Sequence, residues 1–507
     1  IFRNTLFPNE YSILPMNLPS HSSDHEDTEV RTLSNEARAI IDASTRGPVL
    51  LFLGSSIFWL VIGSLLKLLA DWQLTIPALM DCAALFTYGR TEPAQSNVMT
   101  YGWASTAAFG TGLWVTARLS RIPLLHSKLL ISAGIIWNLG VMLGTAGILI
   151  GDGNAIPGLD FPGYASPILL IAYSLIATWI IITLNYREPG PLYVSQWFLF
   201  AGFLCFPWLY ATANVLLVWN PIQASAQGPI ACWFLENLTN LWLAPVAIGI
   251  IFYIVPKVIS RPIASPSLSV LGFWTLIVFA SWTGLSNLVG GPVPAWMMSA
   301  GVAASIMAII PVLSIVLNLH LTLHGNYAAM SWSPTLRFTV FGLYGFLFSG
   351  VLATLLALPA FNAVLQFSDV IAGASLLSLY GFVSMTFFGA IYYIVPRLIN
   401  AEWPCVQLIR WHFWFALSGL LLAFSCLLLG GLLQGFSQYD VASTFRSSIE
   451  FVAPFRLMTA LSTGLLVLAH LSFALLFVLM LLKTGKSQSG PALLNEPTEN
   501  SLETLAV

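Results

Sequence analysis

Runs of about 20 apolar residues recur along almost the whole of this 507-residue chain, and they constrain its fold more than any other feature. Each run is long enough to cross a hydrocarbon core of roughly 30 Å. In lipid such a run must be helical, because every backbone donor and acceptor has to be paired within the segment. Hydrophobic residues make up 57% of the chain and charged residues only 8%. A soluble protein of this length would carry far more charge on its surface.

We therefore expect an all-α integral membrane protein with twelve transmembrane helices. The predicted spans are residues 48–70, 97–118, 127–150, 166–186, 194–218, 231–255, 267–289, 293–319, 335–358, 370–396, 410–433 and 452–482. They divide the chain into a polar N-terminal tail (1–46), a membrane domain (47–484) and a C-terminal tail (485–507). The tail before the first span shows no signal peptide, so we expect that span to be retained.

Charged residues are distributed unevenly between the two sets of connections. The even-numbered connections and the C-terminal flank carry basic residues: Arg118, Arg121, Lys128, Arg187, Lys257, Arg261, Arg337, Arg397, Arg410, Lys483 and Lys486. The odd-numbered connections carry mostly acids: Asp71, Asp81, Glu92, Asp152, Asp160, Asp369, Asp440 and Glu450. By the positive-inside rule both termini face the cytoplasm.

Three features that often mark a cofactor site carry little weight here. The tract at 20–27 mixes two histidines with acids, which can bind metal but is more typical of a solvated tail. The cysteines form no C-x-x-C motif, so iron–sulfur and covalent haem c sites are unsupported, and we expect small buried residues instead. They are Cys82, Cys205, Cys232, Cys405 and Cys426. We find no nucleotide-binding fingerprint.

Several short tracts resemble subunit I of the cbb3-type haem–copper oxidases, in the same order and at similar spacing. They are YGR at 88–90 with Pro93, YVSQWF at 193–198, FYIVPK at 252–257 followed by Arg261 and Pro262, Phe273 with Trp274, Trp282 with Gly284, GFVSM at 381–385, YYIVP at 392–396, WHFW at 411–414 and GLLQG at 431–435. No single tract is decisive, but together they span all twelve predicted helices. The resemblance implies the twelve-helix bundle of an oxidase subunit I.

The resemblance also implies where the family's metal ligands would lie, and none of these positions carries the family's residue. They are Gln95 for the low-spin haem histidine of helix 2; Ala374 and Leu376, in the tract that begins at Gln366, for the haem histidines of helix 10; Glu236, Ser286 and Asn287 for the copper histidines; Ala280 for the active-site tyrosine; and Glu92 for a haem-contacting arginine. We predict that haem and copper are absent. The chain then has no catalytic, cofactor-binding or metal-binding residues, and lipid or quinone is a candidate for the space.

Chemistry supports this prediction. Low-spin haem iron needs two strong axial donors, usually imidazole or thioether, and an amide or an aliphatic side chain supplies neither. Copper in such a site needs imidazole nitrogens. A glutamate with a serine and an asparagine offers oxygen ligands, which suit a hard ion such as calcium or magnesium better.

The remaining histidines do not restore the ligand set. His320 and His324 stand four residues apart, a spacing that can bind metal, but no third donor is evident, and a polar pair at the interface beside Arg337 is the simpler interpretation. We expect His412 to be structural, His470 to be hydrogen-bonded between helices, and His126 to lie at the cytoplasmic surface.

Two intramembrane or interfacial acids remain open to more than one interpretation. Glu236 lies near the outer end of helix 6, where it could relay protons or hold a cation. The simpler alternative is that it hydrogen-bonds to Asn237, Asn240 or Ser286 and fills volume that copper ligands would occupy. Asp369 resembles a family position and is expected at the outer surface.

Three functions follow from these observations. The first is a cofactor-free scaffold subunit in a respiratory or photosynthetic electron-transfer complex, which would not be catalytic by itself. The second is the catalytic subunit of a terminal cytochrome c oxidase or a nitric oxide reductase with altered ligands. The third is a transporter, although no six-plus-six repeat is evident. For the first we expect membrane partners that include a cytochrome c-type subunit, bound lipid, no nucleic acid, and a location in the inner membrane of a bacterium.

Overall fold

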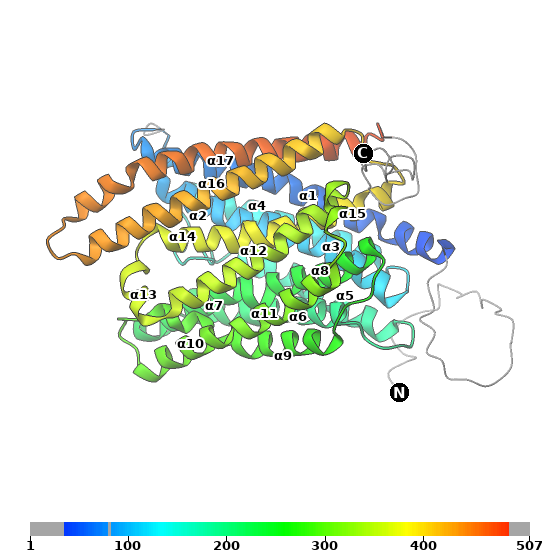
Figure 1. Ribbon diagram of the computed structural model, residues 1–507, viewed down its shortest axis with the longest axis horizontal. Helices are drawn as coiled ribbons and strands as arrows, with labels where there is room; N and C mark the ends of the chain where they lie inside the picture. The colour runs from blue at the N-terminus through cyan, green and yellow to red at the C-terminus, as the bar shows by residue number, and fades with distance from the viewer. Residues whose placement is uncertain (1–34, 80–82, 486–507) are drawn as a thin grey trace.

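The chain is described by a computed structural model covering residues 35–79 and 83–485, and this part of the chain contains helices and no strands. Long helices run nearly parallel to one axis of the molecule (Figure 1). The start of α1 and the end of α17 lie at the same end of the bundle. The helical spans alternate in direction between the two ends, as a membrane protein with short connections requires.

The α-helices are α1 Asn35–Thr75, α2 Tyr88–Asn97, α3 Ser105–Ser120, α4 Ser127–Ile150, α5 Ser166–Tyr186, α6 Val194–Ala213, α7 Ala224–Asn237, α8 Ala244–Ile259, α9 Pro266–Thr283, α10 Ala295–Met307, α11 Ile309–Leu323, α12 Pro334–Ala357, α13 Pro359–Leu365, α14 Asp369–Leu376, α15 Met385–Ile399, α16 Val406–Tyr439 and α17 Phe445–Leu481. Four π-helical segments interrupt the spans: η2 Val98–Ala104, η3 Asn214–Trp219, η4 Leu238–Leu243 and η7 Leu377–Ser384. Short 3₁₀ turns are η1 Ala84–Phe86, η5 Gly284–Leu288 and η6 Tyr327–Ser331.

The predicted twelve-span topology is confirmed. Eleven helices within the described residues are long and apolar enough to cross a membrane. The continuous helical run α2–η2–α3 supplies the second predicted span and contains more polar residues than the others. The first helix begins at Asn35, earlier than the first apolar run.

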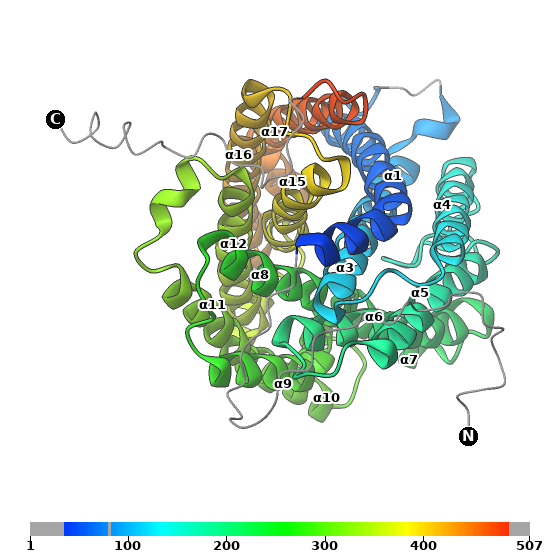
Figure 2. The ribbon, with the colours of Figure 1, turned by 90° about the vertical axis from the view of Figure 1, so that its right-hand side faces the viewer.

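Three helices form the centre of the bundle. Figure 2 shows α3, α8 and α15 surrounded by the others, and these three helices contact one another. Almost every residue of each is buried. Each central helix follows directly on a π segment and ends at a residue with positive φ: Arg121 (57°), Ser260 (53°) and Asn400 (56°). The fold therefore repeats one unit, a helix, a π segment and a central helix, three times.

Small residues allow α12 to pack closely against the third unit. A Cβ atom on Gly345 would collide with the backbone of Gly381, and one on Gly389 would collide with the Thr339 side chain. Close backbone approach at small residues is a common source of dispersion contact between membrane helices. The orientation of α15 is therefore set partly by positions where only glycine fits.

The structure corrects the sequence analysis on the acidic residues of the odd-numbered connections. Asp71 does not lie in a connection, because α1 continues to Thr75 and its carboxylate is 4% exposed. Asp160 is in a loop but is also buried, and it accepts a hydrogen bond from Asn97 at 2.6 Å. Of the other acids in the odd-numbered connections, Asp369 and Glu450 form ion pairs with arginines. Asp81 lies outside the described residues, and Asp152 and Asp440 form no ion pair within residues 35–79 and 83–485.

Candidate functional site

The positions expected to correspond to metal ligands occur at equivalent places in the three repeated units. Gln95 lies just before η2, Glu236 just before η4, and Ala374 and Leu376 just before η7. A π segment adds a residue to one helical turn and re-aims the side chains around it, and such segments are frequent at functional sites. A π segment therefore directly follows the expected ligand positions in all three units.

The positions expected for copper do lie close together, and they form a polar cluster. Glu236 Oε1 accepts a hydrogen bond from Asn287 Nδ2 at 3.1 Å, and its Oε2 accepts one from Asn240 Nδ2 at 3.3 Å. The Asn240 amide also donates to Thr283 Oγ1 at 3.3 Å. Of the partners expected for Glu236, Asn240 is therefore confirmed, whereas Asn237 donates to the Trp233 carbonyl instead.

The cluster also includes Ser286 and Gln366. Ser286 Oγ donates to the Thr283 carbonyl at 2.8 Å rather than to Glu236. Gln366 donates from Nε2 to the Asn287 carbonyl at 3.2 Å and accepts from Asn362 at 3.0 Å. Amide and hydroxyl groups thus supply the cluster's hydrogen bonds. Ala280 is buried one turn before Thr283 and offers only a methyl group.

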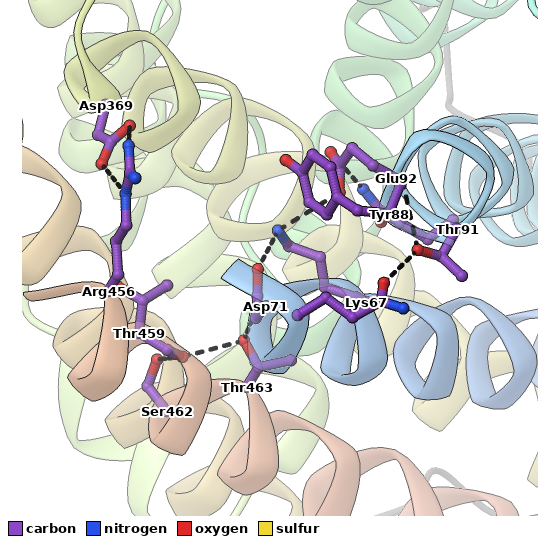
Figure 3. A network of polar contacts seen from close by, with 12 residues as sticks. Lys67, Asp71, Tyr88, Thr91, Glu92, Asp369, Arg456, Thr459, Ser462 and Thr463 are labelled. Carbon is purple, nitrogen blue, oxygen red and sulfur yellow. Dashed lines mark hydrogen bonds and ion pairs between the residues drawn. The ribbon is translucent and has the colours of Figure 1, made fainter. Parts of the chain in front are cut away.

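The second polar cluster contains Lys67, Asp71 and Glu92 and joins α1, α2 and α17 (Figure 3). Gln95 Nε2 donates to Glu92 Oε1 at 3.0 Å, so its amide is used within its own helix. Lys67 Nζ lies 2.7 Å from Asp71 Oδ1 and 4.0 Å from Glu92 Oε2. Asp71 Oδ2 in turn accepts from Thr463 Oγ1 of α17 at 2.6 Å.

Two further contacts tie this cluster to the neighbouring elements. Gln73 accepts from Thr91 Oγ1 at 2.8 Å, which joins α1 to α2 a second time. On α14, the Asp369 carboxylate accepts from Nε and Nη2 of Arg456 at 3.1 and 3.3 Å, the forked geometry typical of a strong arginine–carboxylate pair. Asp369 is therefore paired with Arg456 of α17 (Figure 3).

Further along the same helices, the second and tenth spans contact each other directly. Trp103 Nε1 donates to Ser384 Oγ at 2.8 Å, and these two residues lie eight positions after Gln95 and Leu376 respectively. At 1.5 Å per residue this contact is about 12 Å deeper in the bundle. Phe388 packs against Trp103 with ring centroids 5.0 Å apart.

The two buried histidines belong to this aromatic cluster. His470 Nε2 is hydrogen-bonded to Tyr380 of η7 at 2.9 Å, which confirms the expected bond between helices. His412 Nδ1 is bonded to Tyr392 at 2.8 Å, and Phe473 stacks on its ring at 4.6 Å. Both imidazoles are thus held by tyrosine hydroxyls.

The other candidate donors do not assemble. His320 Nδ1 contacts the Tyr327 and Tyr344 hydroxyls at 2.7 and 3.3 Å, whereas the His324 backbone carbonyl accepts from Arg261. Within residues 35–79 and 83–485 no three histidine, cysteine or acidic side chains are grouped closely enough to hold a metal ion. The tract at 20–27 and Cys82 lie outside the described residues.

Sequence reasoning missed Lys67 and Asp71 as members of an interior cluster. A signal was available, because a lysine and an aspartate four residues apart on a helix face each other. The apolar run ends between them, which suggested that the helix ended there too. Thr463, 392 residues away in the sequence, carried no signal of its own.

Comparison with known proteins now identifies the family. Residues 47–467 match the family described as cytochrome c and quinol oxidase polypeptide I. The chain belongs to this family.

Similar proteins agree with this assignment. The chain is 25% identical over 442 residues to a cytochrome c oxidase subunit 1 homolog of Agrobacterium tumefaciens (strain T37), with 82% of this chain and 81% of the relative covered. It is 25% identical over 387 residues to the cbb3-type cytochrome c oxidase subunit CcoN1 of Stutzerimonas stutzeri, covering 75% and 82% of the two chains.

A solved structure extends the likeness to the fold. A chain of a haem–copper terminal oxidase dimer aligns with a TM-score of 0.69 and 14% identity, over 93% of this chain and 90% of that one. The haem–copper oxidase subunit I fold predicted from the tracts is therefore confirmed. Identity at this level shows the fold alone.

Proposed function

We propose that this member of the oxidase subunit I family is a cofactor-free membrane scaffold that acts within a larger electron-transfer complex. The observation that carries the proposal is the set of side chains that stand before the three π segments. They are the Gln95 amide, which is bonded within its own helix, the Glu236 carboxylate, which is bonded to two amides, and the aliphatic side chains of Ala374 and Leu376.

These donors do not fit haem iron or copper. An iron between the second and tenth spans would meet Gln95 on one side and Leu376 on the other, and neither is a strong axial ligand. A copper ion beside Glu236 would meet oxygen and amide groups rather than imidazole. The two interior histidines, His412 and His470, each use one ring nitrogen on a tyrosine of the third unit.

The interior packing is also consistent with the proposal. A cavity of porphyrin size with apolar walls would be costly if left empty, at about 24 cal/mol per Å³. Trp103, Phe388 and Phe473 pack with ring centroids 5.0 and 5.2 Å apart between the spans that would flank a low-spin haem. Bulky side chains would thus supply the contacts that a cofactor gives in a catalytic relative.

A cofactor assay on the purified full chain tests the first part. We expect the pyridine-haemochrome spectrum and metal analysis to give far less than one haem and one copper per chain, after growth in a haem-replete host. A Soret band at stoichiometric haem, or oxygen consumption that depends on this chain alone, would contradict the proposal and favour the catalytic alternative.

Deletion of the chain tests the second part. We propose that it assembles with other subunits in the inner membrane of a bacterium, with both termini in the cytoplasm, and that a cytochrome c-type subunit is among the partners. Blue-native electrophoresis of membranes lacking the chain should then show a smaller or missing electron-transfer complex. A chain that purifies as a stable monomer, and whose deletion leaves every such complex unchanged, is not a structural subunit.

A further inference from the structure

A hollow of 340 Å³ opens at the basic end of the bundle, where α8 turns into α9. Its lining consists of Pro256, Lys257, Ser260, Arg261 and Pro262. Ser260 ends α8 in the left-handed conformation, with φ at 53°, and the chain reverses there. The turn thereby places the side chains of Lys257 and Arg261 around the same hollow, and both are exposed.

Within the described part of the chain, the two cations of the hollow have no carboxylate partner. Within the described ranges, neither Lys257 nor Arg261 forms an ion pair with an aspartate or glutamate. One side of the Arg261 guanidinium is fixed, because its Nη1 donates to the His324 carbonyl at 3.2 Å. The Asn326 side-chain oxygen accepts from Nε and Nη1 at 3.2 and 3.1 Å, so the Nη2 N–H groups remain to donate to an anion.

Further positive charge surrounds the hollow. Arg38, Arg118 and Arg121 lie within electrostatic range of the Lys257 ammonium. Two acids offset part of this charge: Asp42 pairs with Arg118 at 2.9 Å, and Glu188 lies 3.8 Å from Arg121. Five cations against two carboxylates leave a local positive excess that favours an anion in the hollow.

Exposed apolar side chains follow the hollow along the chain. The helix that follows the turn, α9, exposes Val270, Leu271 and Trp274, with 37%, 45% and 56% of their surfaces accessible. These residues lie within the predicted seventh span, so this face meets hydrocarbon. A ligand with a negative head and an apolar tail would satisfy both surfaces, whereas a soluble anion would use only the first.

We propose that this hollow binds the phosphate head of an anionic phospholipid, with Lys257 and Arg261 contacting the phosphate and an acyl chain lying along α9. Basic pockets between spans at the membrane boundary are suited to such headgroups. The hollow lies on the surface of the bundle at its basic end, so lipid binding there does not rest on the absence of haem or copper.

Lipid titration of the full chain by native mass spectrometry tests the proposal. The probes are phosphatidylglycerol and, as a neutral reference, phosphatidylcholine, each added to delipidated protein in the same detergent. The test variant is Lys257→Gln/Arg261→Gln. The matched control is Lys128→Gln/Arg410→Gln, which removes two exposed charges at the same end of the bundle.

We expect the native chain and the control to retain phosphatidylglycerol in preference to phosphatidylcholine. Each charge removed from the hollow should weaken phosphatidylglycerol binding about fivefold, or roughly 25-fold for the double variant. Equal loss in the test and control variants would overturn the proposal, since charge at this end would then act without a site. Should the double variant misfold, Lys257→Gln alone, with an expected fivefold loss, decides the same question.

Two other occupants are distinguished by the same assay. If inorganic phosphate displaces the lipid and binds with comparable affinity, the hollow is a small-anion site and the lipid assignment is wrong. Residues 1–34 can also be removed from the native chain and from the Lys257→Gln/Arg261→Gln variant. If this removal raises lipid occupancy in the native chain but not in the variant, the acids at 20–27 compete with the lipid for the two cations, which supports the site. If the tail's removal abolishes lipid binding, the tail rather than the hollow carries it, and the proposal fails.

Discussion

Asp71 offers the most direct test of the interior polar cluster. Its carboxylate is 4% exposed and has two partners, Lys67 Nζ at 2.7 Å and Thr463 Oγ1 at 2.6 Å. The substitution Asp71→Asn keeps the size of the side chain and an oxygen that can accept from Thr463. It removes the negative charge, so the Lys67 ammonium keeps only Glu92, 4.0 Å away.

The magnitude follows from the burial of the partners. Breaking a fully buried ion pair by removing one member costs about 3–5 kcal/mol, because the other charge is left uncompensated. The Lys67 side chain is 35% exposed, so water recovers part of that loss. We therefore expect Asp71→Asn to lower the free energy of unfolding by about 2–3 kcal/mol. A loss of about 2 kcal/mol is a roughly thirtyfold change in the folded-to-unfolded ratio.

Reversible unfolding by SDS in mixed micelles, followed by tryptophan fluorescence, measures this change. The variants needed are Asp71→Asn, Lys67→Met and the apolar double variant Lys67→Met/Asp71→Leu. The double variant should be less destabilised than the sum of the single effects, because no unpaired charge remains.

A loss below about 0.5 kcal/mol for Asp71→Asn would refute this reasoning, since it is within the range of ordinary surface substitutions. Additive effects in the cycle would refute it as well. Thr463→Val is the control for the hydroxyl: it should cost less than Asp71→Asn, since both charges of the pair remain.

Three further predictions address other parts of the bundle. Burial raises the pKa of the Asp160 carboxyl above its ordinary 3.8, although its hydrogen bonds lower it. The stability that this carboxyl contributes is therefore full below pH 3.8 and is lost as pH rises through the raised pKa. In pH-dependent unfolding, Asp160→Asn should gain stability relative to the native protein as pH rises through this range, and a pH-independent difference would contradict this. Tyr380→Phe should cost about 1–3 kcal/mol of unfolding free energy because it leaves the buried His470 imidazole without its partner, and an unchanged unfolding midpoint would argue against that bond. Gly345→Ala should destabilise more than Gly464→Ala, whose added methyl group meets nothing within 4 Å, and equal unfolding midpoints would show that α12 can shift.

The spans were determined by the sequence alone. Each apolar run has the length that a bilayer demands, and a helix is the only way to pair its backbone there, so local composition is sufficient. The distribution of arginine and lysine at alternating ends is likewise a property of the linear chain. The resemblance of short tracts then fixed the family, because their order survives where overall identity is only 25%.

Helix boundaries and hydrogen-bond partners depended on the tertiary structure. The apolar run of the first span ends before Asp71, yet α1 continues, because Lys67 and Thr463 compensate the carboxylate inside the bundle. Likewise, the sequence offered Asn237, Asn240 and Ser286 as partners for Glu236; the structure confirms Asn240, and helix packing adds Asn287, 51 residues away.

The three repeated units were also invisible in the linear chain except for the paired IVP tracts before Lys257 and Arg397. A π segment has no strong sequence signature, since it arises when packing makes an extra residue in one turn cheaper than a straight helix. The sequence determined which side chains stand before η2, η4 and η7. Only the packing of α3, α8 and α15 around one another decided which way these side chains point, because side-chain direction in a long buried helix is set by its neighbours and not by its own periodicity.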